Sequence, residues 1–151
     1  MSSSLVKKLG AKAEMRAILI GAPTEVIDAI RSTNLELRSK LTGSFDFIQV
    51  FLKEEKRLRR AFRRLKPHLA STGMLWVSWP KKNQLNTDLT MTTIIKIGYD
   101  CGMVESKCVS VNLVWSGIKF TFPKQGKIYQ NSYGQLKHSA RSNRSKSALT
   151  R

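Results

Sequence analysis

The sequence predicts a small three-layer α/β domain with a mostly parallel β-sheet and an antiparallel β-hairpin near its C-terminal end. Two observations carry this prediction. Short apolar runs of strand length alternate with segments of helical periodicity, and this alternation is typical of a parallel sheet covered on both faces. The last two apolar runs follow each other with no helix between them, which indicates a hairpin.

The first third of the chain is expected to supply two parallel strands and a short helix between them. Residues 1–14 form a basic lead-in, in which a short helix would end at Gly10. The apolar run 16–20 predicts a buried strand, because the turn residues 21–23 close it. Thr24 is placed to cap a short helix, and alternating leucines over 34–41 predict a half-buried or edge strand.

The middle of the chain contains a strong strand and the clearest helix. The run 45–52 is apolar and rich in β-forming residues, as expected of a central strand. From Glu54 to Leu69, apolar residues recur at helical spacing and the other positions are mostly basic. The helix-breaking residues 71–73 separate this helix from a third strand, predicted over 74–79.

The C-terminal part is predicted to complete the domain with a helix and a hairpin. Thr87 or Asp88 is placed to cap the helix. Strands over 105–114 and 118–122 follow, joined by a short connection, 115–117, that contains glycine. Apolar residues become sparse after these strands, which indicates disorder. The expected organisation is a basic lead-in at 1–14, a folded domain at 15–123 and a basic, disordered tail at 124–151.

The composition restricts the class of protein. Hydrophobic residues make up 41% of the 151 residues, which is enough for a folded core. No apolar run reaches the roughly 18–20 residues of a membrane span, and the polar start has no apolar signal segment. We therefore expect a cytoplasmic protein without membrane contact, in which Cys101 and Cys108 are free thiols.

No catalytic or metal-binding constellation is predicted. His68 and His138 have no carboxylate or cysteine near them in the spacing of a catalytic triad or a metal site. Asp46 lies between two phenylalanines and is interpreted as a polar contact at a strand end. We therefore assign no residue to catalysis and none to a metal.

The net charge is the unusual property of this chain. Its 27 Lys and Arg residues outnumber ten Asp and Glu residues, for a net charge of +17, and such a field attracts polyanions. The basic residues gather on the predicted helix after Glu55 and in the tail, so nucleic acid or an acidic protein is a candidate partner. The alternative is an ordinary solvated helix face. The residues assigned to this contact are Arg57, Arg59, Arg60, Arg63, Arg64, Lys66, Arg141, Arg144 and Lys146.

Residues 45–122 resemble the second half of the class I methyltransferases, which have a Rossmann-like fold. The similarity lies in the apolar strand at 45–51, in the final strand pair and in the passage LKPHLASTGMLWV at 65–77. That passage is similar to the family's LKPGG-x-L sequence, which leads from a helix into the next strand. The resemblance implies a reduced Rossmann-like fold, with S-adenosylmethionine as a candidate cofactor.

Residues 8–122 also resemble a bacterial family of small proteins of unknown function. This resemblance brings no activity with it. The segments that carry it are KLG at 8–10, MR at 15–16, GAP at 21–23, LWVSWPKK at 75–82, TDL at 87–89 and WSGIKF at 115–120.

The methyltransferase resemblance is weakest where the cofactor would bind. The family has an acidic residue and a Gly-x-Gly turn after the first strand, whereas this chain has Gly21, Ala22 and Pro23. Glu36 is the candidate for the family's second acid, which holds the ribose, but it is placed within a strand. Only 21 residues separate Pro23 from Phe45, too few for the helices and strands of the full fold.

Any ligand is expected outside the carboxyl ends of the parallel strands. There Trp79 could stack on a planar anion such as a nucleotide, with Lys81 and Lys82 meeting its charge; the alternative is a core tryptophan beside a solvated loop. Trp115 is interpreted as hairpin packing and Asp88 as a helix cap. The hypothetical ligand cleft comprises Gly21, Ala22, Pro23, Trp79, Pro80, Lys81, Lys82 and Asp88.

Two functions of different class follow from these observations. The first is a non-catalytic Rossmann-like binding or accessory protein that contacts nucleic acid or an acidic protein through its basic surface. The second is a minimal S-adenosylmethionine-dependent methyltransferase with a non-standard cofactor loop. Fold resemblance alone does not decide between them.

Overall fold

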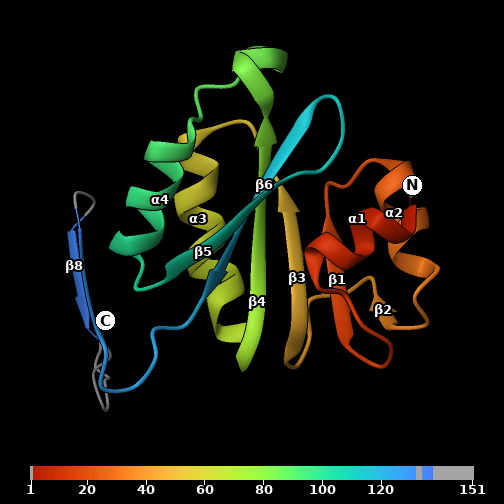
Figure 1. Cartoon of the computed structure of the whole chain (residues 1–151), viewed down its shortest axis with the longest axis horizontal. Helices are drawn as coiled ribbons and strands as arrows, with labels where there is room; N and C mark the ends of the chain where they lie inside the picture. Colours follow the sequence, from red (N-terminus) through yellow and green to blue (C-terminus); the bar gives the residue numbers. More distant parts are fainter. Residues whose placement is uncertain (1, 132–133, 138–151) are drawn as a thin grey trace.

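A six-stranded sheet forms the middle layer of the protein, in the order β2-β1-β3-β4-β6-β5 (Figure 1). The computed structural model describes residues 2–131 and 134–137. Strands β2, β1, β3 and β4 are parallel, whereas β6 is antiparallel to β4 and β5 is antiparallel to β6. The strands are β1 (Arg16–Ile20), β2 (Glu36–Arg38), β3 (Phe45–Phe51), β4 (Leu69–Pro80), β5 (Val104–Ser110) and β6 (Trp115–Thr121).

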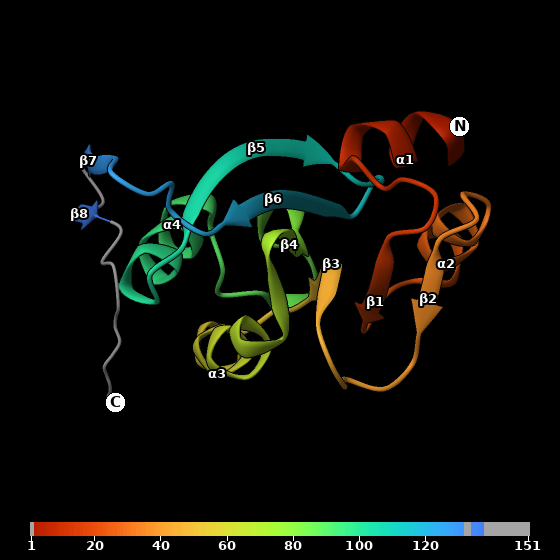
Figure 2. The same ribbon diagram turned by 90° about the horizontal axis from the view of Figure 1, so that it is seen from below.

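Helices cover both faces of this sheet (Figure 2). Helices α1 and α2 lie on one side and α3 and α4 on the other, which confirms the predicted three-layer Rossmann-like architecture. Two short 3₁₀ segments, η1 (Lys66–His68) and η2 (Lys81–Asn86), lie at opposite ends of β4. The α-helices are α1 (Ser2–Leu9), α2 (Thr24–Arg31), α3 (Glu55–Leu65) and α4 (Met91–Asp100).

The sheet separates two apolar clusters. On the side of α1 and α2, Leu9 and Ile30 pack towards Phe47 and Trp76. On the other side, the apolar stripe of α3 packs with that of α4 against β3, β4 and β6. The alternation of the strand residues decides this division, because successive side chains point to opposite faces of a sheet. The α3 stripe consists of Leu58, Phe62 and Leu65, and all three are fully buried.

The N-terminal lead-in forms part of the folded unit. The indole Nε1 of Trp76 donates a buried hydrogen bond to the carbonyl oxygen of Leu9, at 3.0 Å. Val6 is buried in the same cluster. Helix α1, which the sequence places outside the domain, therefore covers the centre of the sheet.

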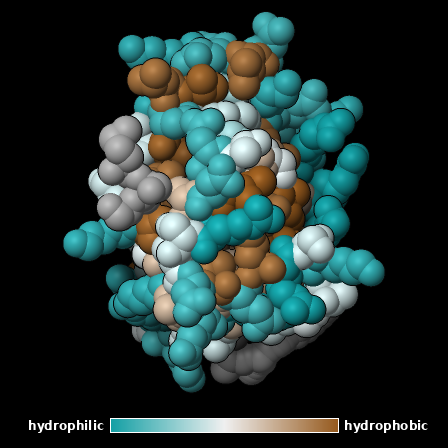
Figure 3. All heavy atoms as spheres, turned by 90° about the vertical axis from the view of Figure 1, so that its right-hand side faces the viewer, coloured by the Kyte–Doolittle hydropathy of each residue, from teal (hydrophilic) through white to brown (hydrophobic). Residues whose placement is uncertain are grey.

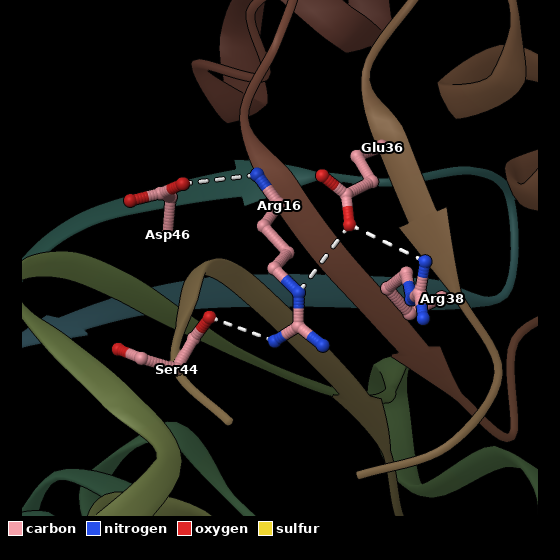
Figure 4. A network of polar contacts seen from close by, with 5 residues as sticks. All are labelled: Arg16, Glu36, Arg38, Ser44 and Asp46. Atoms are coloured by element: carbon pink, nitrogen blue, oxygen red, sulfur yellow. Dashed lines mark hydrogen bonds and ion pairs between the residues drawn. The ribbon is translucent and has the colours of Figure 1, made fainter. Parts of the chain in front are cut away.

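The edge strand β2 has only three residues, and an ion network holds it beside β1 (Figure 4). Glu36 accepts contacts from Arg16 and Arg38, each at 3.4 Å. The Arg16 guanidinium also donates to the carbonyl oxygen of Ser44 at 2.8 Å, while the Arg16 backbone N–H donates to Asp46 at 2.9 Å. Asp46 is therefore the polar contact that the sequence predicts.

The predicted boundaries of β4 and of the hairpin are wrong. Residues 71–73 continue β4 instead of breaking it, and a register shift against β3 between Phe45 and Phe47 accommodates the extra length. Residues 115–117 belong to β6, and the hairpin turns earlier. The Asn112 side chain makes that turn, because its Oδ1 accepts from the backbone N–H groups of Val114 and Trp115 at 2.9 and 2.8 Å.

Helix α4 begins later than predicted. Thr90, rather than Thr87 or Asp88, is its N-cap, and the Thr90 hydroxyl accepts from the backbone N–H of Thr93. Asp88 instead accepts from the backbone N–H of Glu55 at 2.9 Å and so caps α3. A carboxylate at the start of a helix also interacts favourably with the helix dipole.

The first part of the predicted disordered tail forms an antiparallel strand pair. Strands β7 (Ile128–Asn131) and β8 (Gly134–Lys137) pair with each other and not with the main sheet. The prediction of disorder does not hold there, because paired strands satisfy their backbone groups despite the polar composition. Residues 138–151, which include Arg141, Arg144 and Lys146, lie outside the described residues.

No helix in the described part of the chain is long and apolar enough to cross a membrane. A cytoplasmic location stays a prediction. Cys101 is half-buried at the end of α4, and Cys108 is exposed on β5; both are free thiols.

The contact between α4 and β6 requires a glycine. A Cβ atom at Gly98 would overlap the ring of Phe120, which is itself fully buried and stacks edge-on against Phe62. We expect Gly98→Ala to lower the free energy of unfolding by about 1–3 kcal/mol, the usual effect of overpacking a core. Urea denaturation measures this change. Lys96→Ala, an exposed substitution on the same helix, is the control, and an equal midpoint for both variants would contradict the prediction.

Candidate ligand crevice

An open crevice lies at the carboxyl ends of β1 and β3, at the upper edge of the sheet in Figure 1. Its volume is about 500 Å³. Ligands bind at this edge in open α/β sheets. The strand order changes direction at β1, because β2 lies on one side of it and β3 on the other. The lining residues are Gly21, Phe51, Leu52, Lys53, Glu54, Arg57, Leu85 and Trp115.

Gly21 forms the turn by which the chain leaves β1. Its φ is +72°, a conformation that other residues rarely adopt, and a Cβ atom there would lie 3.2 Å from the carbonyl oxygen of Phe51. Pro23 follows in extended conformation, and its carbonyl oxygen accepts from the backbone N–H of Val26 at 3.0 Å. Gly21, the one glycine of the expected cofactor turn, thus lets the backbones of β1 and β3 approach each other. Helix α2 begins shortly after it.

Trp115 forms the wall of the crevice on the side of the hairpin. It is the first residue of β6 and pairs with Pro80, the last residue of β4, so the antiparallel hairpin brings it to the carboxyl edge. Its ring meets that of Phe51 edge-on, with centroids 5.1 Å apart. Trp115 therefore does pack within the hairpin region as the sequence indicates, but it also lines the crevice, which the sequence analysis missed.

Charged groups of both signs border the crevice. The Arg57 Nε donates to Glu54 Oε1 at 2.9 Å, and both side chains are at least half exposed. Lys53 is exposed beside them, at the end of β3. Glu54 is the one carboxylate among the lining residues, so it can accept hydrogen bonds from a ligand.

The η2 loop forms the outer rim. Leu85 projects from it with 49% of its surface exposed. Four residues of this loop, Lys82, Asn83, Leu85 and Asn86, have positive φ angles without being glycine, which stores backbone strain at the mouth of the crevice.

Several residues assigned to the hypothetical cleft point elsewhere. Trp79 is 7% exposed and belongs to the apolar core, so the alternative of a core tryptophan is the one observed. The Lys81 ammonium turns towards β5, where it donates to the Ser110 hydroxyl at 2.6 Å. Asp88 caps α3, and Lys82 is an exposed residue of the η2 loop. Of the residues assigned to the hypothetical ligand cleft, Gly21 lines the crevice. Ala22, Pro23 and Pro80 lie in the backbone next to it.

Glu36 does not occupy the position of a ribose-binding acid. It is the first residue of β2, and its register partner is Arg16 at the amino end of β1. The residue at the carboxyl end of β2 is Arg38, a cation where the methyltransferase pattern has an acid. Arg38 forms an ion pair with Glu36 and does not line the crevice, so β2 supplies no acid to a ligand there.

The basic residues of α3 and η1 that were assigned to a polyanion fall into two groups. Arg57 contacts Glu54, Arg59 contacts Asp100 at 3.3 Å, and the Lys66 ammonium donates to the carbonyl oxygen of Cys101 at 2.6 Å. Arg60, Arg63 and Arg64 are exposed and have no ion pair or side-chain hydrogen bond within 2–131 and 134–137. The first group contacts other residues of the chain, whereas the second group is available to a partner.

The titratable groups with shifted pKa values lie away from the crevice. Burial lowers the pKa of Lys66, which the neighbouring Cys101 partly opposes. Burial raises the pKa of the Cys101 thiol, and the Lys66 charge opposes that shift. His68 contacts the carbonyl oxygen of Gly43, and no cluster of metal-ligating side chains occurs among the described residues. These groups have structural roles at the far side of α3.

The fold is similar to that of solved methyltransferases and of a synthase-like protein. A methyltransferase from Pyrococcus furiosus is 14% identical, with a TM-score of 0.51 over 78% of this chain and 79% of its own. A TehB-like SAM-dependent methyltransferase from Corynebacterium glutamicum is 11% identical, with a TM-score of 0.54 over 80% and 86%. A cyclopropane-fatty-acyl-phospholipid synthase-like protein from Lactobacillus casei is 8% identical, with a TM-score of 0.57 over 80% and 89%.

At these identities the similarity concerns the fold alone. No protein-family profile matches the chain, and no curated protein matches its sequence. Membership in the bacterial family of unknown function therefore stays a prediction, whereas the methyltransferase-like Rossmann fold is established.

The close approach at Gly21 predicts a specific loss of stability on substitution. Gly21→Ala combines a left-handed backbone, which disfavours other residues by about 1–2 kcal/mol, with the contact to the Phe51 carbonyl. Gly126→Ala is the matched control, because Gly126 has a similar φ of +81° but no atom within 4 Å of its added Cβ. We expect urea denaturation to show the larger loss for Gly21→Ala. Equal losses would mean that the contact with β3 contributes nothing.

Proposed function

We propose that this chain binds S-adenosylmethionine in the crevice at Gly21 and acts as a minimal methyltransferase. The observation that carries the proposal is the open crevice of about 500 Å³ at the carboxyl ends of β1 and β3. In the Rossmann-like architecture this is the edge of the sheet at which nucleotide ligands bind. The bound cofactor would supply a methyl group activated by its sulfonium charge.

Three features of the crevice suit an adenosyl ligand. Gly21 lines the crevice and has no side chain, so a ligand there can approach its backbone. The Trp115 ring on the opposite wall can attract the sulfonium, because aromatic faces stabilise cations. Leu52 and Leu85 provide apolar surface for the adenine ring.

The charged residues suit the amino-acid part of the same ligand. S-adenosylmethionine carries one carboxylate and one ammonium group. Lys53 and Arg57 would bind the carboxylate, and Glu54 would accept a hydrogen bond from the ammonium group or from a ribose hydroxyl. In this arrangement the protein binds and orients the cofactor, which is the main contribution an enzyme makes to a direct group transfer.

Arg38 is the feature that fits least well. A carboxylate at the end of the second strand would bind two ribose hydroxyls, whereas a guanidinium donates hydrogen bonds and accepts none. Glu54 would have to serve the ribose from the other side of the crevice. The cofactor loop is non-standard in this respect, and we expect modest affinity as a result.

The structural neighbours support this proposal better than a non-catalytic accessory role, because they are methyltransferases whose fold this chain shares. Contact with nucleic acid through α3 and the tail stays a prediction. Three of its six predicted residues on α3 and η1 already contact other residues of the chain. Arg60, Arg63 and Arg64 could still contribute to it.

Calorimetric titration with S-adenosylmethionine and S-adenosylhomocysteine tests the site. We expect dissociation constants in the micromolar range for the unmodified protein and at least tenfold weaker binding for Trp115→Ala, because the wall of the crevice is lost. Leu113→Ala is the matched control, since Leu113 lies in the same hairpin turn with 91% of its surface exposed. Failure of both ligands to bind at millimolar concentration would refute the proposal.

A second experiment separates catalysis from binding. The protein is incubated with methyl-labelled S-adenosylmethionine and a cell extract, and the label is measured in nucleic acid, protein and small-molecule fractions. Transfer that requires Trp115 but not Leu113 would support a methyltransferase. Tight cofactor binding without any transfer would instead favour the non-catalytic binding protein.

A further inference from the structure

On the face of the sheet that α3 covers, no described helix lies over β1 and β2. The chain passes from β2 to β3 through residues 39–44, without any helix between the two strands. Figure 2 shows α3 below β3 and β4, while no helix lies below β1 and β2 on that side. Parallel sheets normally have both faces covered, so this space is an incomplete layer.

The space beside α3 is an apolar groove that we call the arginine groove. Its floor is formed by Ile20, Val50 and Leu52 at the ends of β1 and β3. Ala61 and Leu65 of α3 form the apolar part of its wall, and its volume is about 210 Å³. Ile20, Leu52 and Ala61 are half-buried, so each still presents apolar surface to solvent. The side of the molecule that carries β2 shows apolar atoms gathered between hydrophilic ones (Figure 3).

Three arginines form the rim of the groove. Arg57, Arg60 and Arg64 line it from α3, at positions that recur on one side of a helix. Arg57 contacts Glu54, but Arg60 and Arg64 have no ion pair or hydrogen bond within the part of the chain that the structure describes. The groove therefore combines an apolar floor with uncompensated positive charge.

The geometry points to one kind of occupant: we propose that the arginine groove binds an acidic amphipathic α-helix from a partner protein. A helix lying beside α3 would complete the missing layer and bury Ile20, Leu52 and Ala61 with its apolar face. Glutamates along its flank would meet Arg60 and Arg64, and guanidinium–carboxylate contacts are among the strongest hydrogen-bonded pairs. Arg57 and Arg64 are about 10 Å apart along the helix axis at 1.5 Å per residue, so two turns of partner helix would face all three arginines.

Charge excludes two occupants, namely a second copy of this chain and the chain's own C-terminal residues. A second copy of this chain carries a net charge of +17 and has no acidic segment, and no Asp or Glu follows Glu105 in its own C-terminal residues. Nucleic acid would satisfy the arginines but leave the apolar floor uncovered. A partner surface that complements the arginine groove is therefore both acidic and apolar.

The test uses a synthetic peptide of about 14 residues, cross-linked to hold a helix that would be marginal by itself at this length. The peptide has leucines at positions i, i+3, i+4 and i+7 and glutamates beside them. A control peptide replaces each glutamate by lysine. We expect fluorescence anisotropy to show micromolar binding of the acidic peptide to the full chain, weakening as salt is raised, and no binding of the basic peptide.

Variants of the protein locate the contact. Arg60→Glu with Arg64→Glu should weaken binding at least tenfold, whereas Arg31→Glu with Arg63→Glu, which changes the net charge equally at exposed positions outside the groove, should not. Ala61→Phe should also weaken binding, because it fills the groove without a change of charge. Circular dichroism checks that each variant folds.

Three results would overturn the proposal. Equal losses for the two arginine pairs would mean a general effect of charge, and unchanged binding to Ala61→Phe would mean that the groove is not used. An RNA oligonucleotide that binds through Arg60 and Arg64 more tightly than the peptide and displaces it would assign the surface to nucleic acid. Arg60, Ala61 and Arg64 do not line the crevice, so the peptide test and the cofactor titration can fail independently.

Discussion

The close approach of β1 to β3 at their carboxyl ends is the constraint on which the site depends. Gly21 allows it, because the position has a positive φ and its added Cβ would contact the Phe51 carbonyl. The same turn directs the chain into α2 on one face of the sheet, while β3 continues towards α3 on the other. Because the two connections leave on opposite faces of the sheet, the crevice lies between them. Trp115 forms its wall on the side of the hairpin.

The unusual charge of the chain is distributed between structural and available groups. On the edge strand, Arg16 and Arg38 share Glu36, and the Arg16 guanidinium also lies 4.2 Å from the centroid of the Phe45 ring. These contacts anchor a three-residue strand that could contribute little packing of its own. On α3, by contrast, Arg60 and Arg64 remain beside an apolar floor. Net charge alone did not distinguish these two uses.

The shortened connection between β2 and β3 links the two candidate sites. Because this connection contains no helix, β1 is uncovered on the α3 side, and Ile20 and Leu52 are partly exposed. Leu52 and Arg57 border both the crevice and the arginine groove. A helix bound in the groove would therefore lie next to a ligand in the crevice, and the two binding events would be coupled through these side chains if both occur.

The amino-acid sequence by itself determined the architecture of this protein. Periodicity placed β1, β3, α3 and the core of β4 close to their observed positions, because these elements bury continuous apolar stripes whose spacing is a local property. It also identified Gly21 as the turn at the ligand edge. The start of β4 was missed, since its register depends on β3, which is distant in sequence. The hairpin turn was missed although the Asn112 contacts that form it are local.

Only the tertiary structure decided which side chains meet at that edge. The sequence analysis made Trp79 the candidate for stacking on a ligand and Trp115 a hairpin residue, whereas in the structure Trp79 is buried and the pairing of β6 with β4 places Trp115 in the crevice. The contacts of Asp88 with the start of α3 and of Lys81 with Ser110 likewise join residues that are far apart in the sequence. A pattern along the chain records the hydrophobic face of each element, whereas the direction of a loop side chain depends on neighbours that are distant in sequence.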